Sequence, residues 1–491
     1  MALELRAIQT MINANQKLIK YLIYAAIVLL GAILRFVRLG DPKDLVFDET
    51  YYVKDAYSYT LSGTERAWNS DANTDFISGN PDGIQDTGEY AVHPPVGKWL
   101  IAIGIKLFGQ SSTFGWRFSA AVIGTISIFL LILVAEKLFS STLLATTSGL
   151  LMAIDGVAIT ESRTSLLDIF LMFWALLAFY FLILDREKVR QEVNKEGLGI
   201  HWWRPYRLVA GITLGLAAGT KWSGLYFIAV WGLACAWWDF KLNKKNWVYA
   251  PISFLYLVGT GLVTYLISWT GWIRSSIGYD RYWAQSNPGQ TVAWLPKWLQ
   301  SLWAYQENAY SFHIHLHNSH PYAAQAWGWA LQVRPTAFYY ESYQRGQNGC
   351  NADQCATAVT SLGNPFIWWF ASASLLVLIY FLFRHKDWRA GAILSGIVGG
   401  YLPWFLYPER TTYTFYSIAF FPFMALAATY VLGLVLGPST ASYLRRQDGF
   451  IVFTIILIIF TVASAFFYPI WTAEMISHTA WQHRMWFNSW I

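Results

Sequence analysis

Two adjacent carboxylates, Asp48 and Glu49, stand among aromatic residues in the segment "VFDETYY", just past the first long apolar stretch of the chain. A carboxylate at the edge of an apolar region keeps its access to water while it borders a medium of low dielectric constant, and there it can act as a general base. The alternative is structural: the pair is the solvated acidic start of a helix. The pair alone does not decide between these two interpretations.

His93 and Lys98 form a second candidate group, in the segment "HPPVGKW". The two prolines stiffen the chain, and Gly97 allows a close turn before the helix that carries Lys98. His93 and Lys98 can therefore flank an anionic group near the start of that helix. The alternative is a rigid corner with a lysine at the membrane interface.

Three more cations lie beside apolar segments: Arg163 in "ESRTSLL", Lys221 in "GTKWSGL" and Arg410 in "YPERTTY". Arg163 offers a planar fork of donors that suits a phosphate at the membrane edge, although it can also pair with Glu161 or Asp168. A lysine among apolar residues must reach outward or pair. The topology predicted below puts these cations on one side of the membrane, where a lipid phosphate would satisfy them.

A calcium loop is one of two metal-site patterns in the sequence. The spacing of Asp71, Asn73 and Asp75 is similar to such a loop, but Phe76 stands where the sharp turn requires glycine. No Asp-x-Asp motif accompanies Asp48. We therefore expect no obligatory divalent metal ion and no other obligatory cofactor.

The segment "SFHIHLHNSH" contains four closely spaced histidines, the second metal-site pattern. Alternate histidines on one strand face can bind a transition metal, but neither a cysteine nor a carboxylate accompanies them at metal-ligand spacing. We interpret this segment and the tryptophan-rich stretch after it as the aromatic and polar wall of a binding groove. The groove residues are His313, His317, His320 and Trp327.

Cys350 and Cys355 lie close together in a polar segment that the topology places outside the cytoplasm. A short-loop disulfide is therefore expected between them. Cys235 sits in an apolar run and is expected to be a buried thiol.

The composition is that of a polytopic membrane protein. Of the 491 residues, 55% are hydrophobic and 18% aromatic, whereas only 13% are charged. The net charge of +6 comes from short basic clusters between apolar runs rather than from one basic stripe, so we expect no nucleic-acid partner. The sequence has no Walker loop, dinucleotide fingerprint or Gly-x-Ser-x-Gly motif, which argues against soluble nucleotide chemistry.

The elements that must position these residues are membrane helices. A hydrocarbon core about 30 Å thick requires roughly 17 to 25 apolar residues per helix, and the sequence has about eleven such segments. Their approximate limits are 19–38, 116–136, 141–158, 165–184, 207–223, 224–239, 249–269, 365–384, 390–406, 413–436 and 449–468. The pair around Lys221 can also be read as one long bent span. The shorter segment "VGKWLIAIGIKLFG" is predicted to be an interfacial helix, and no cleavable signal peptide is expected.

The short loops between these spans predict the orientation. The basic loops "DREKVRQEVNKEGLGIHWWRPYR", "DFKLNKKNW", "RHKDWR" and "YLRRQDG" fall on one side, which the positive-inside rule makes cytoplasmic. The N-terminus is then cytoplasmic and the C-terminus extracytoplasmic. Two long polar segments, 39–115 and 270–364, face the exterior, and loops of this length usually carry function.

Several motifs, in their order along the chain, resemble the protein O-mannosyltransferase family, most closely its actinobacterial branch. They are "FDETYY", "HPPVGKWLIA", "GWRFSAAVIGT", "ESRTSLLDIFLMF", "GTKWSGLYF", "SHPYAAQAWGWALQVRPTAFYYE", "GYLPWFLYPERTTYTFY" and "YPIWTAEMISHTAWQHRMWFNSWI". The resemblance runs from about residue 30 to the C-terminus.

This resemblance implies an all-α polytopic membrane protein with a C-type glycosyltransferase (GT-C) fold, in which residues 1–491 form one domain. It implies an inverting reaction that moves mannose from polyprenyl-phosphate mannose to Ser or Thr hydroxyls of secreted or membrane proteins, outside the plasma membrane. The expected partners are this lipid donor, membrane lipids and acceptor polypeptides, with emergence from the secretion channel as one route.

The resemblance also implies roles for the candidate residues. Asp48 is expected to be the base, and Glu49 to orient the acceptor or tune Asp48. The residues expected to face the donor phosphate are Arg163, Lys98, Lys221, Arg410 and His93. Eukaryotic members insert a domain of MIR repeats into the large outer loop. Segment 270–364 is too short to contain it, so acceptor choice is expected to rest on the histidine- and tryptophan-rich loop.

Three other functions stay open from the sequence. The first is another GT-C enzyme that transfers a sugar from a polyprenyl phosphate to a lipid or a cell-wall glycan. The second is a transporter of lipid-linked sugars, although its ionisable residues would be spread through the bilayer midplane rather than gathered at one edge. The third is a non-catalytic membrane scaffold, which leaves the concentrated cations and the Asp-Glu pair unexplained.

Overall fold

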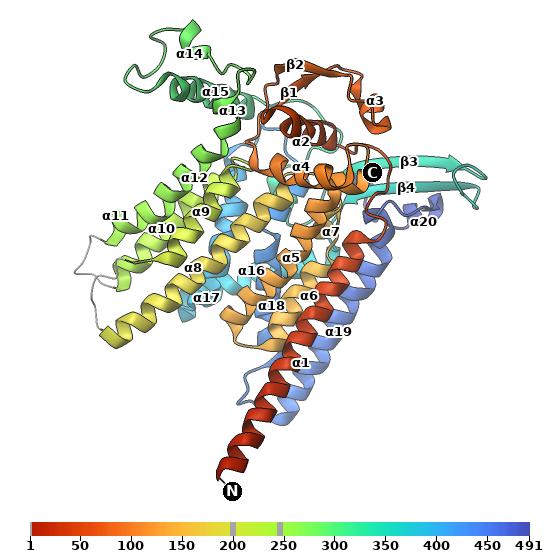
Figure 1. The fold of residues 1–491 in the computed structure, drawn as a ribbon. Helices are drawn as coiled ribbons and strands as arrows, with labels where there is room; N and C mark the ends of the chain where they lie inside the picture. The colour runs from red at the N-terminus through yellow and green to blue at the C-terminus, as the bar shows by residue number, and fades with distance from the viewer. Residues whose placement is uncertain (1, 197–202, 243–248) are drawn as a thin grey trace.

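A bundle of long helices carries a layer of short helices and strands at one end (Figure 1). The computed structural model describes residues 2–196, 203–242 and 249–491. The helices are α1 (Ala2–Phe36), α2 (Glu49–Ser62), α3 (Ala72–Ser78), α4 (Val96–Phe108), α5 (Thr113–Phe139), α6 (Thr142–Ile154), α7 (Gly156–Ser162), α8 (Asp168–Glu196), α9 (Pro205–Ala218), α10 (Gly224–Leu242), α11 (Tyr249–Phe254), α12 (Thr260–Ser268), α13 (Thr270–Arg274), α14 (Trp283–Ser286), α15 (Lys297–Ile314), α16 (Pro365–His385), α17 (Trp388–Gly400), α18 (Phe421–Leu436), α19 (Tyr443–Phe467) and α20 (His478–Gln482). The strands are β1 (Arg66–Trp68), β2 (Ile84–Gly88), β3 (Thr336–Gln344), β4 (Gln354–Ser361) and β5 (Ile476–Ser477).

Every predicted membrane span overlaps a helix, but the count of eleven crossings stays a prediction. Six helical segments of the described chain are long and apolar enough to cross a membrane, and α6 with α7, bent by 62°, makes a seventh. The six are Asn15–Phe36, Thr113–Phe139, Asp168–Val193, Pro251–Ser268, Pro365–His385 and Tyr443–Trp471. Helices α9, α17 and α18 have only 14, 13 and 16 residues. At 1.5 Å per residue they are shorter than the hydrocarbon core, and 3₁₀ turns extend α17 and α18.

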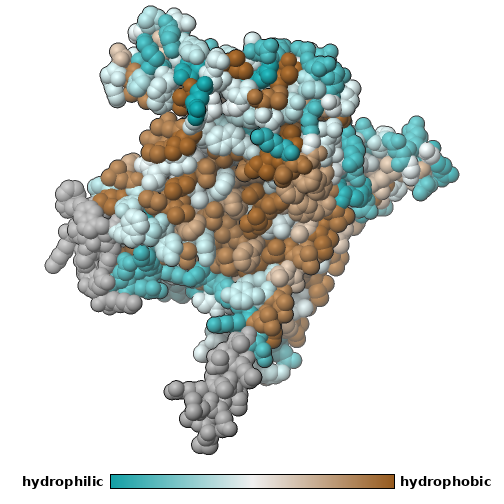
Figure 2. All heavy atoms as spheres, viewed as in Figure 1, coloured by the Kyte–Doolittle hydropathy of each residue, from teal (hydrophilic) through white to brown (hydrophobic). Residues whose placement is uncertain are grey.

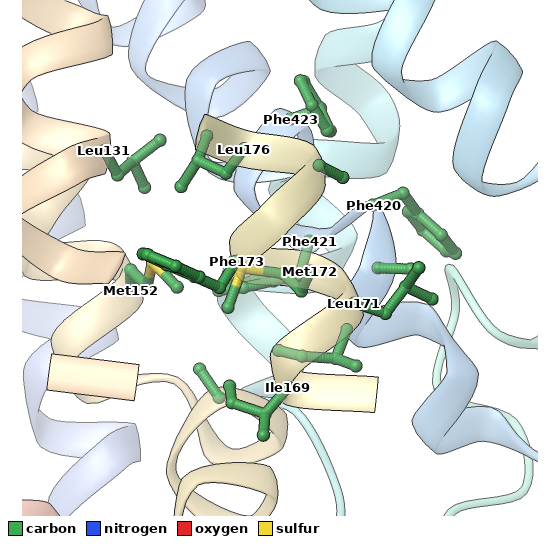
Figure 3. Close-up of a cluster of buried hydrophobic side chains, with 14 of the residues drawn as sticks. Leu131, Met152, Ile169, Leu171, Met172, Phe173, Leu176, Phe420, Phe421 and Phe423 are labelled. Carbon is green, nitrogen blue, oxygen red and sulfur yellow. The ribbon is translucent and has the colours of Figure 1, made fainter. Parts of the chain in front are cut away.

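The core is built around α8, whose first turns are apolar on every side and therefore buried on every side. Figure 3 shows Met172 and Phe173 of α8 beside Met152 of α6 and Phe421 of α18. Further out, α9 packs on α12. A Cβ at Gly211 or Gly215 of α9 would collide with the α12 backbone or Thr260, so the small-xxx-small spacing permits this close packing. This core fixes the helix ends that carry the candidate site.

The segment around Lys221 is a break between two helices, not one long bent span. Helix α9 ends at Ala218 and α10 begins at Gly224, and the two pack against each other. Lys221 therefore lies in a short loop at the end of the bundle.

The two long polar segments form the layer at the end of the bundle opposite the N-terminus (Figure 1). Segment 39–115 contains α2 to α4 with the β1–β2 pair, and segment 270–364 contains α13 to α15 with β3 and β4. The predicted interfacial segment is α4, which leaves Ile103 and Leu107 about half exposed or more, at 49% and 63%. The C-terminus also lies at this end (Figure 1). Figure 2 shows the layer as largely hydrophilic above a brown hydrophobic band.

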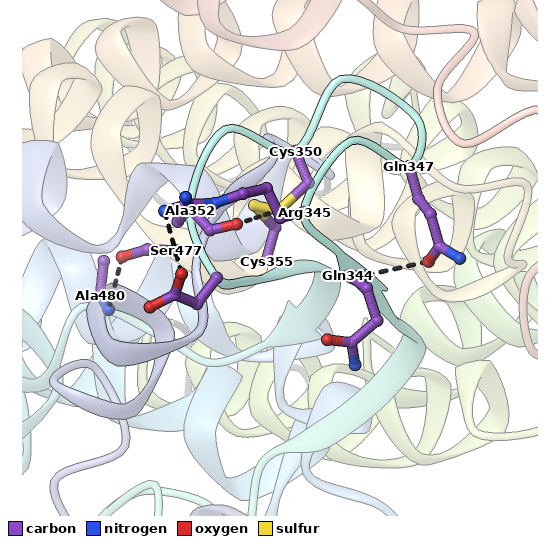
Figure 4. Close-up of a disulfide and its surroundings, with 9 residues drawn as sticks. Gln344, Arg345, Gln347, Cys350, Ala352, Cys355, Ser477 and Ala480 are labelled. Atoms are coloured by element: carbon purple, nitrogen blue, oxygen red, sulfur yellow. Dashed lines mark hydrogen bonds and ion pairs between the residues drawn. A yellow bond between two sulfur atoms is a disulfide. The ribbon is translucent and has the colours of Figure 1, made fainter.

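The all-α prediction needs a correction, because two small antiparallel sheets lie outside the bundle. In the larger sheet, β3 pairs with β4 and β4 with β5. The β3 sequence "TAFYYESYQ" is rich in aromatic residues, which favour strands. Cys350 and Cys355 form the expected disulfide at the β3–β4 turn (Figure 4). Cys235 is a buried free thiol, as expected.

Candidate functional site

Asp48 lies at the N-cap of α2, immediately after a sharply turned residue. Phe47 has a φ of +51°, which is unusual for a bulky residue and needs support from its surroundings. That support is aromatic: the Phe47 ring stacks on Phe338 at 5.0 Å and meets Tyr413 and Phe415 edge-on at 5.5 Å. The turn at Phe47 fixes the backbone position from which the Asp48 side chain extends.

Glu49, although adjacent to Asp48, is completely buried and fully hydrogen-bonded. Its carboxylate accepts from Nε and Nη2 of Arg117 at 2.9 and 2.8 Å, from the Val46 N–H at 3.0 Å and from the Ser165 N–H at 2.8 Å. Both oxygens are therefore committed, which leaves the prediction that Glu49 orients the acceptor without support. Glu49 instead fixes the backbone that carries Asp48.

Arg117 is a site residue that the sequence analysis missed. It stands in the quoted motif "GWRFSAAVIGT", at the start of an apolar run, where a buried arginine requires a carboxylate partner. Its partner lies 68 residues away in the chain. The sequence therefore indicates that Arg117 needs a carboxylate partner, but it does not indicate that this partner is Glu49.

The Asp48 carboxylate is half-buried and near other charges. The Tyr52 hydroxyl lies 3.5 Å from its Oδ2. Burial raises the pKa of Asp48 to about 6, and Asp168 adds to this rise, whereas Lys221 opposes it. Such a carboxylate gains and loses a proton close to neutral pH, which suits a general base.

Lys221 lies beside this carboxylate in the α9–α10 loop. Its Nζ is 3.0 and 2.9 Å from the two carboxylate oxygens of Asp168, and it lies 4.1 Å from the centre of the Tyr416 ring. Lys221 pairs with Asp168, interacts electrostatically with Asp48 and also lines an adjacent cavity. It therefore places a positive charge at the edge of that cavity.

This cavity has a volume of about 220 Å³ and brings together three of the predicted phosphate-binding residues, namely His93, Lys221 and Arg410, with His313. The His93 and His313 rings stack at 5.3 Å, and Arg410 Nε donates to the His313 carbonyl at 2.9 Å. Trp222, Tyr226 and Trp404 are among the aromatic residues that line the remaining wall.

Two buried nitrogens of the cavity residues have no hydrogen-bond partner among the described residues: Nδ1 of His93 and Nη1 of Arg410. Burial lowers the pKa of His93 well below its usual value, and Lys221, His313, Lys98 and Arg410 add to this effect. Burial likewise lowers the pKa of His313 to about 4. Both histidines are therefore neutral near pH 7, and Lys221 and Arg410 supply the positive charge of the cavity.

Arg163 does not line this cavity, and the structure does not support its prediction as a phosphate ligand. Its guanidinium donates to the carbonyls of Arg35, Val37 and Arg38 at 2.7 to 2.9 Å. These carbonyls lie at and beyond the end of α1, where an arginine satisfies groups that the helix leaves unpaired. The alternative pairing with Glu161 or Asp168 is also not formed: Asp168 pairs with Lys221.

Lys98 is likewise committed elsewhere. It is 1% exposed and pairs with Glu65 and, at 3.5 Å, with Asp55, which ties α4 to α2. Its Nζ also donates to the His93 carbonyl at 2.9 Å. Lys98 therefore positions His93 and does not itself face the cavity.

The predicted groove residues are only partly brought together. His320 contacts the rings of Tyr413 and Phe47, and Nδ1 of His317 lies 2.8 Å from the carbonyl of Glu409, next to Arg410. Trp327 is 60% exposed, and among the described residues its ring has no aromatic neighbour. The acceptor groove stays a prediction.

Two family models together match most of the chain. "Dolichyl-phosphate-mannose-protein mannosyltransferase" matches residues 25–275, and "C-terminal four TMM region of protein-O-mannosyltransferase" matches residues 298–490. The polyprenol-phosphate-mannose–protein mannosyltransferase of Mycolicibacterium smegmatis is 35% identical, over 95% of this chain and 92% of its own. The protein of the same name from Mycobacterium tuberculosis is 32% identical, over 96% and 92%.

Solved structures give the same fold. The Saccharomyces cerevisiae protein O-mannosyltransferase Pmt1–Pmt2 complex bound to the sugar donor matches with a TM-score of 0.72 at 16% identity, over 96% of this chain and 92% of that one. ArnT from Cupriavidus metallidurans, bound to undecaprenyl phosphate, matches with a TM-score of 0.52 at 12% identity, over 92% and 76%. These likenesses confirm the predicted GT-C fold.

Proposed function

Because the chain belongs to the dolichyl-phosphate-mannose-protein mannosyltransferase family, we propose that the cavity beside Asp48 is where its reaction takes place. The protein is a mannosyltransferase that moves mannose from a lipid-linked donor to protein. Its donor is polyprenyl-phosphate mannose, and its acceptors are Ser and Thr hydroxyls. What remains to be assigned is the role of each residue in the site.

One observation carries the assignment of the donor phosphate to this cavity. The unpartnered nitrogens of His93 and Arg410 belong to residues that line the same cavity as the ammonium of Lys221. A buried donor without an acceptor is costly, and an anionic oxygen bound in the cavity would remove that cost for Nη1 of Arg410 and, in the tautomer with its proton on Nδ1, for His93. The aromatic and aliphatic side chains beside them provide an apolar wall for the isoprenoid.

Asp48 is the base in this proposal. It takes the proton of the acceptor hydroxyl as that oxygen forms its bond to the anomeric carbon of mannose. The bond from this carbon to the phosphate oxygen breaks on the opposite face, so the configuration inverts and polyprenyl phosphate leaves. Lys221 and Arg410 stabilise the negative charge that develops on this leaving group, which favours the transition state over the ground state.

The active site faces the outside of the plasma membrane in this proposal. The layer built from segments 39–115 and 270–364 lies above the cavity, within a single GT-C domain. Acceptor polypeptides, including chains that emerge from the secretion channel, reach Asp48 along the surface that carries His317, His320 and Trp327. The aromatic contact of His320 with Phe47 supports this path, because Phe47 directly precedes Asp48.

Transfer of labelled mannose from polyprenyl-phosphate mannose to a Ser/Thr-rich peptide tests the proposal. Replacing a general base lowers the rate by about 10²- to 10⁴-fold, so Asp48→Asn should reduce transfer by that factor. Asp82→Asn is the matched control, because Asp82 is exposed in the same outer layer and should leave transfer unchanged. Full activity of Asp48→Asn would remove Asp48 from the role of base.

A further inference from the structure

A second cavity, of about 430 Å³, lies between α8, α9, α10 and the start of α17. These helix ends lie at the end of the bundle opposite the layer that holds Asp48 (Figure 1). Six cations line the cavity, namely Arg186, Arg190, Arg204, Arg207, Lys241 and Lys386, together with one carboxylate, that of Asp239. Neither the transfer reaction nor the family assignment uses this cavity.

Two of the six cations are neutralised inside the protein. Arg204 donates to both oxygens of Asp185 at 2.8 and 2.6 Å, and Arg207 bridges Asp185 and Asp239. All four residues are buried, so they form a closed ion-pair quartet with no net charge. This quartet forms the buried base of the cavity, and its charges are not available to bind a ligand.

Among the described residues that line the cavity, the other four cations have no acidic counterpart. Among the residues that the structure describes, the side chains of Arg186, Arg190, Lys241 and Lys386 take part in no hydrogen bond or ion pair. The acids close to them in sequence are engaged by other groups: Glu187 pairs with Lys137 at 2.8 Å, and Asp387 with Arg389 at 2.7 Å. The cavity thus keeps an excess of four positive charges.

The guanidinium of Arg186 is positioned by the Trp388 ring in an orientation that allows it to bind an anion. Its guanidinium lies 3.6 Å from the centre of the Trp388 ring, a stacked geometry that fixes the plane and leaves the N–H groups at its edge free. A planar fork of this kind suits two oxygens of a phosphate. Lys241 and Lys386 are exposed and add point charges at the rim.

We propose that this cavity binds a phosphate-bearing anion, at a site separate from the one that holds the donor. Two sources share this chemistry: the head group of an anionic phospholipid and a soluble phosphate compound. Basic pockets between membrane helices commonly hold anionic head groups. Bound there, the anion cross-links the ends of α8 and α10 and the turn between α16 and α17, and stabilises the folded protein.

Thermal unfolding of the full-length protein in a non-ionic detergent tests this proposal. Cardiolipin, phosphatidylcholine and inorganic pyrophosphate are titrated separately. Cardiolipin should raise Tm, and the zwitterionic phosphatidylcholine should not. A rise with pyrophosphate that also depends on Lys241 and Lys386 assigns the site to a soluble phosphate, whereas a rise with cardiolipin alone assigns it to a lipid.

A double variant, Lys241→Gln with Lys386→Gln, should require about tenfold or more anion for the same rise in Tm. Both lysines are exposed, so Tm without anion should match that of the unaltered protein, and mannose transfer should persist. The control is Lys17→Gln with Arg446→Gln, which removes two exposed charges from α1 and α19 outside the cavity. An equal loss of response in both pairs, or no rise in Tm with either anion, would overturn the proposal.

Discussion

Asp48 and Glu49 are neighbours in the chain but have opposite environments. Glu49 accepts four hydrogen bonds, two of which form its ion pair with Arg117. Asp48 has one long contact with Tyr52 and partial access to solvent. Both oxygens of Glu49 are thus taken by partners inside the protein, whereas burial of Asp48 with few partners raises the pKa of its carboxyl. These two environments support the proposal that Glu49 anchors the backbone and Asp48 acts as the base.

This difference predicts an acidic limb in the pH profile of transfer. The base must be ionised, and burial raises the pKa of Asp48 to about 6. As pH falls through 6, kcat/KM should therefore fall, approaching tenfold per pH unit. The profile is measured with the peptide acceptor at subsaturating concentration. Burial also raises the pKa of the Asp55 carboxyl, so Asp55→Asn serves as the control and should leave the limb in place.

The raised pKa of Asp48 also allows a loss of catalysis in Asp48→Asn to be distinguished from a loss of folding. Because the native pKa of Asp48 lies above its unfolded value, the carboxyl favours the folded state below the unfolded pKa, and this contribution is lost as pH rises through about 6. Near neutral pH the ionised group therefore opposes folding. Asp48→Asn should consequently unfold at the same temperature as the unaltered protein or at a higher one, although its mannose transfer is reduced about 10²- to 10⁴-fold.

At the scale of elements, Arg163 joins the end of α1 to the bundle. Its three hydrogen bonds to carbonyls at residues 35, 37 and 38 fix the chain just before the loop that leads to Asp48. Arg163→Ala should lower the free energy of unfolding by about 2 kcal/mol or more, because an unsatisfied buried group costs about 1–3 kcal/mol. It should also lower kcat while the KM for the lipid donor stays within about twofold.

Thermal unfolding and donor titration of Arg163→Ala and Arg163→Lys check this prediction. The lysine variant keeps the charge but loses the planar fork, so it should recover only part of the stability. A large rise in donor KM without a loss of stability would instead return Arg163 to the phosphate site.

Most helices of this fold could be predicted from the sequence, because an apolar run long enough to cross a membrane has few other structures available. His93, Lys221 and Arg410 could be placed near one another, since loops on one side of a membrane converge. The partners that Lys98 and Arg163 have in the structure were not predicted. Their partners depend on tertiary contacts, with Glu65 lying 33 residues before Lys98, and neither spacing nor composition encodes such contacts. The β3–β4 pair was missed because its residues form a strand only against a partner.

At the scale of the whole molecule, the two ends of the bundle carry different structures. Segments 39–115 and 270–364 and the C-terminus lie at one end, and the N-terminus and the cation-rich cavity at the other (Figure 1). Basic loops mark the cytoplasmic side, so the end with the N-terminus should be inside. An odd number of crossings then follows, since the two termini lie on opposite sides.

Single cysteines read out this orientation in intact cells treated with a membrane-impermeant maleimide. The background is low, because Cys350 and Cys355 are bridged and Cys235 is buried. Asp82→Cys and Gln347→Cys, both on exposed residues of the outer layer, should react at once. Lys17→Cys and Arg446→Cys, at the other end, should react only after the cells are permeabilised. The reverse pattern would place Asp48 on the cytoplasmic side, and labelling of residues 17 and 347 from the same side would require an even number of crossings between them.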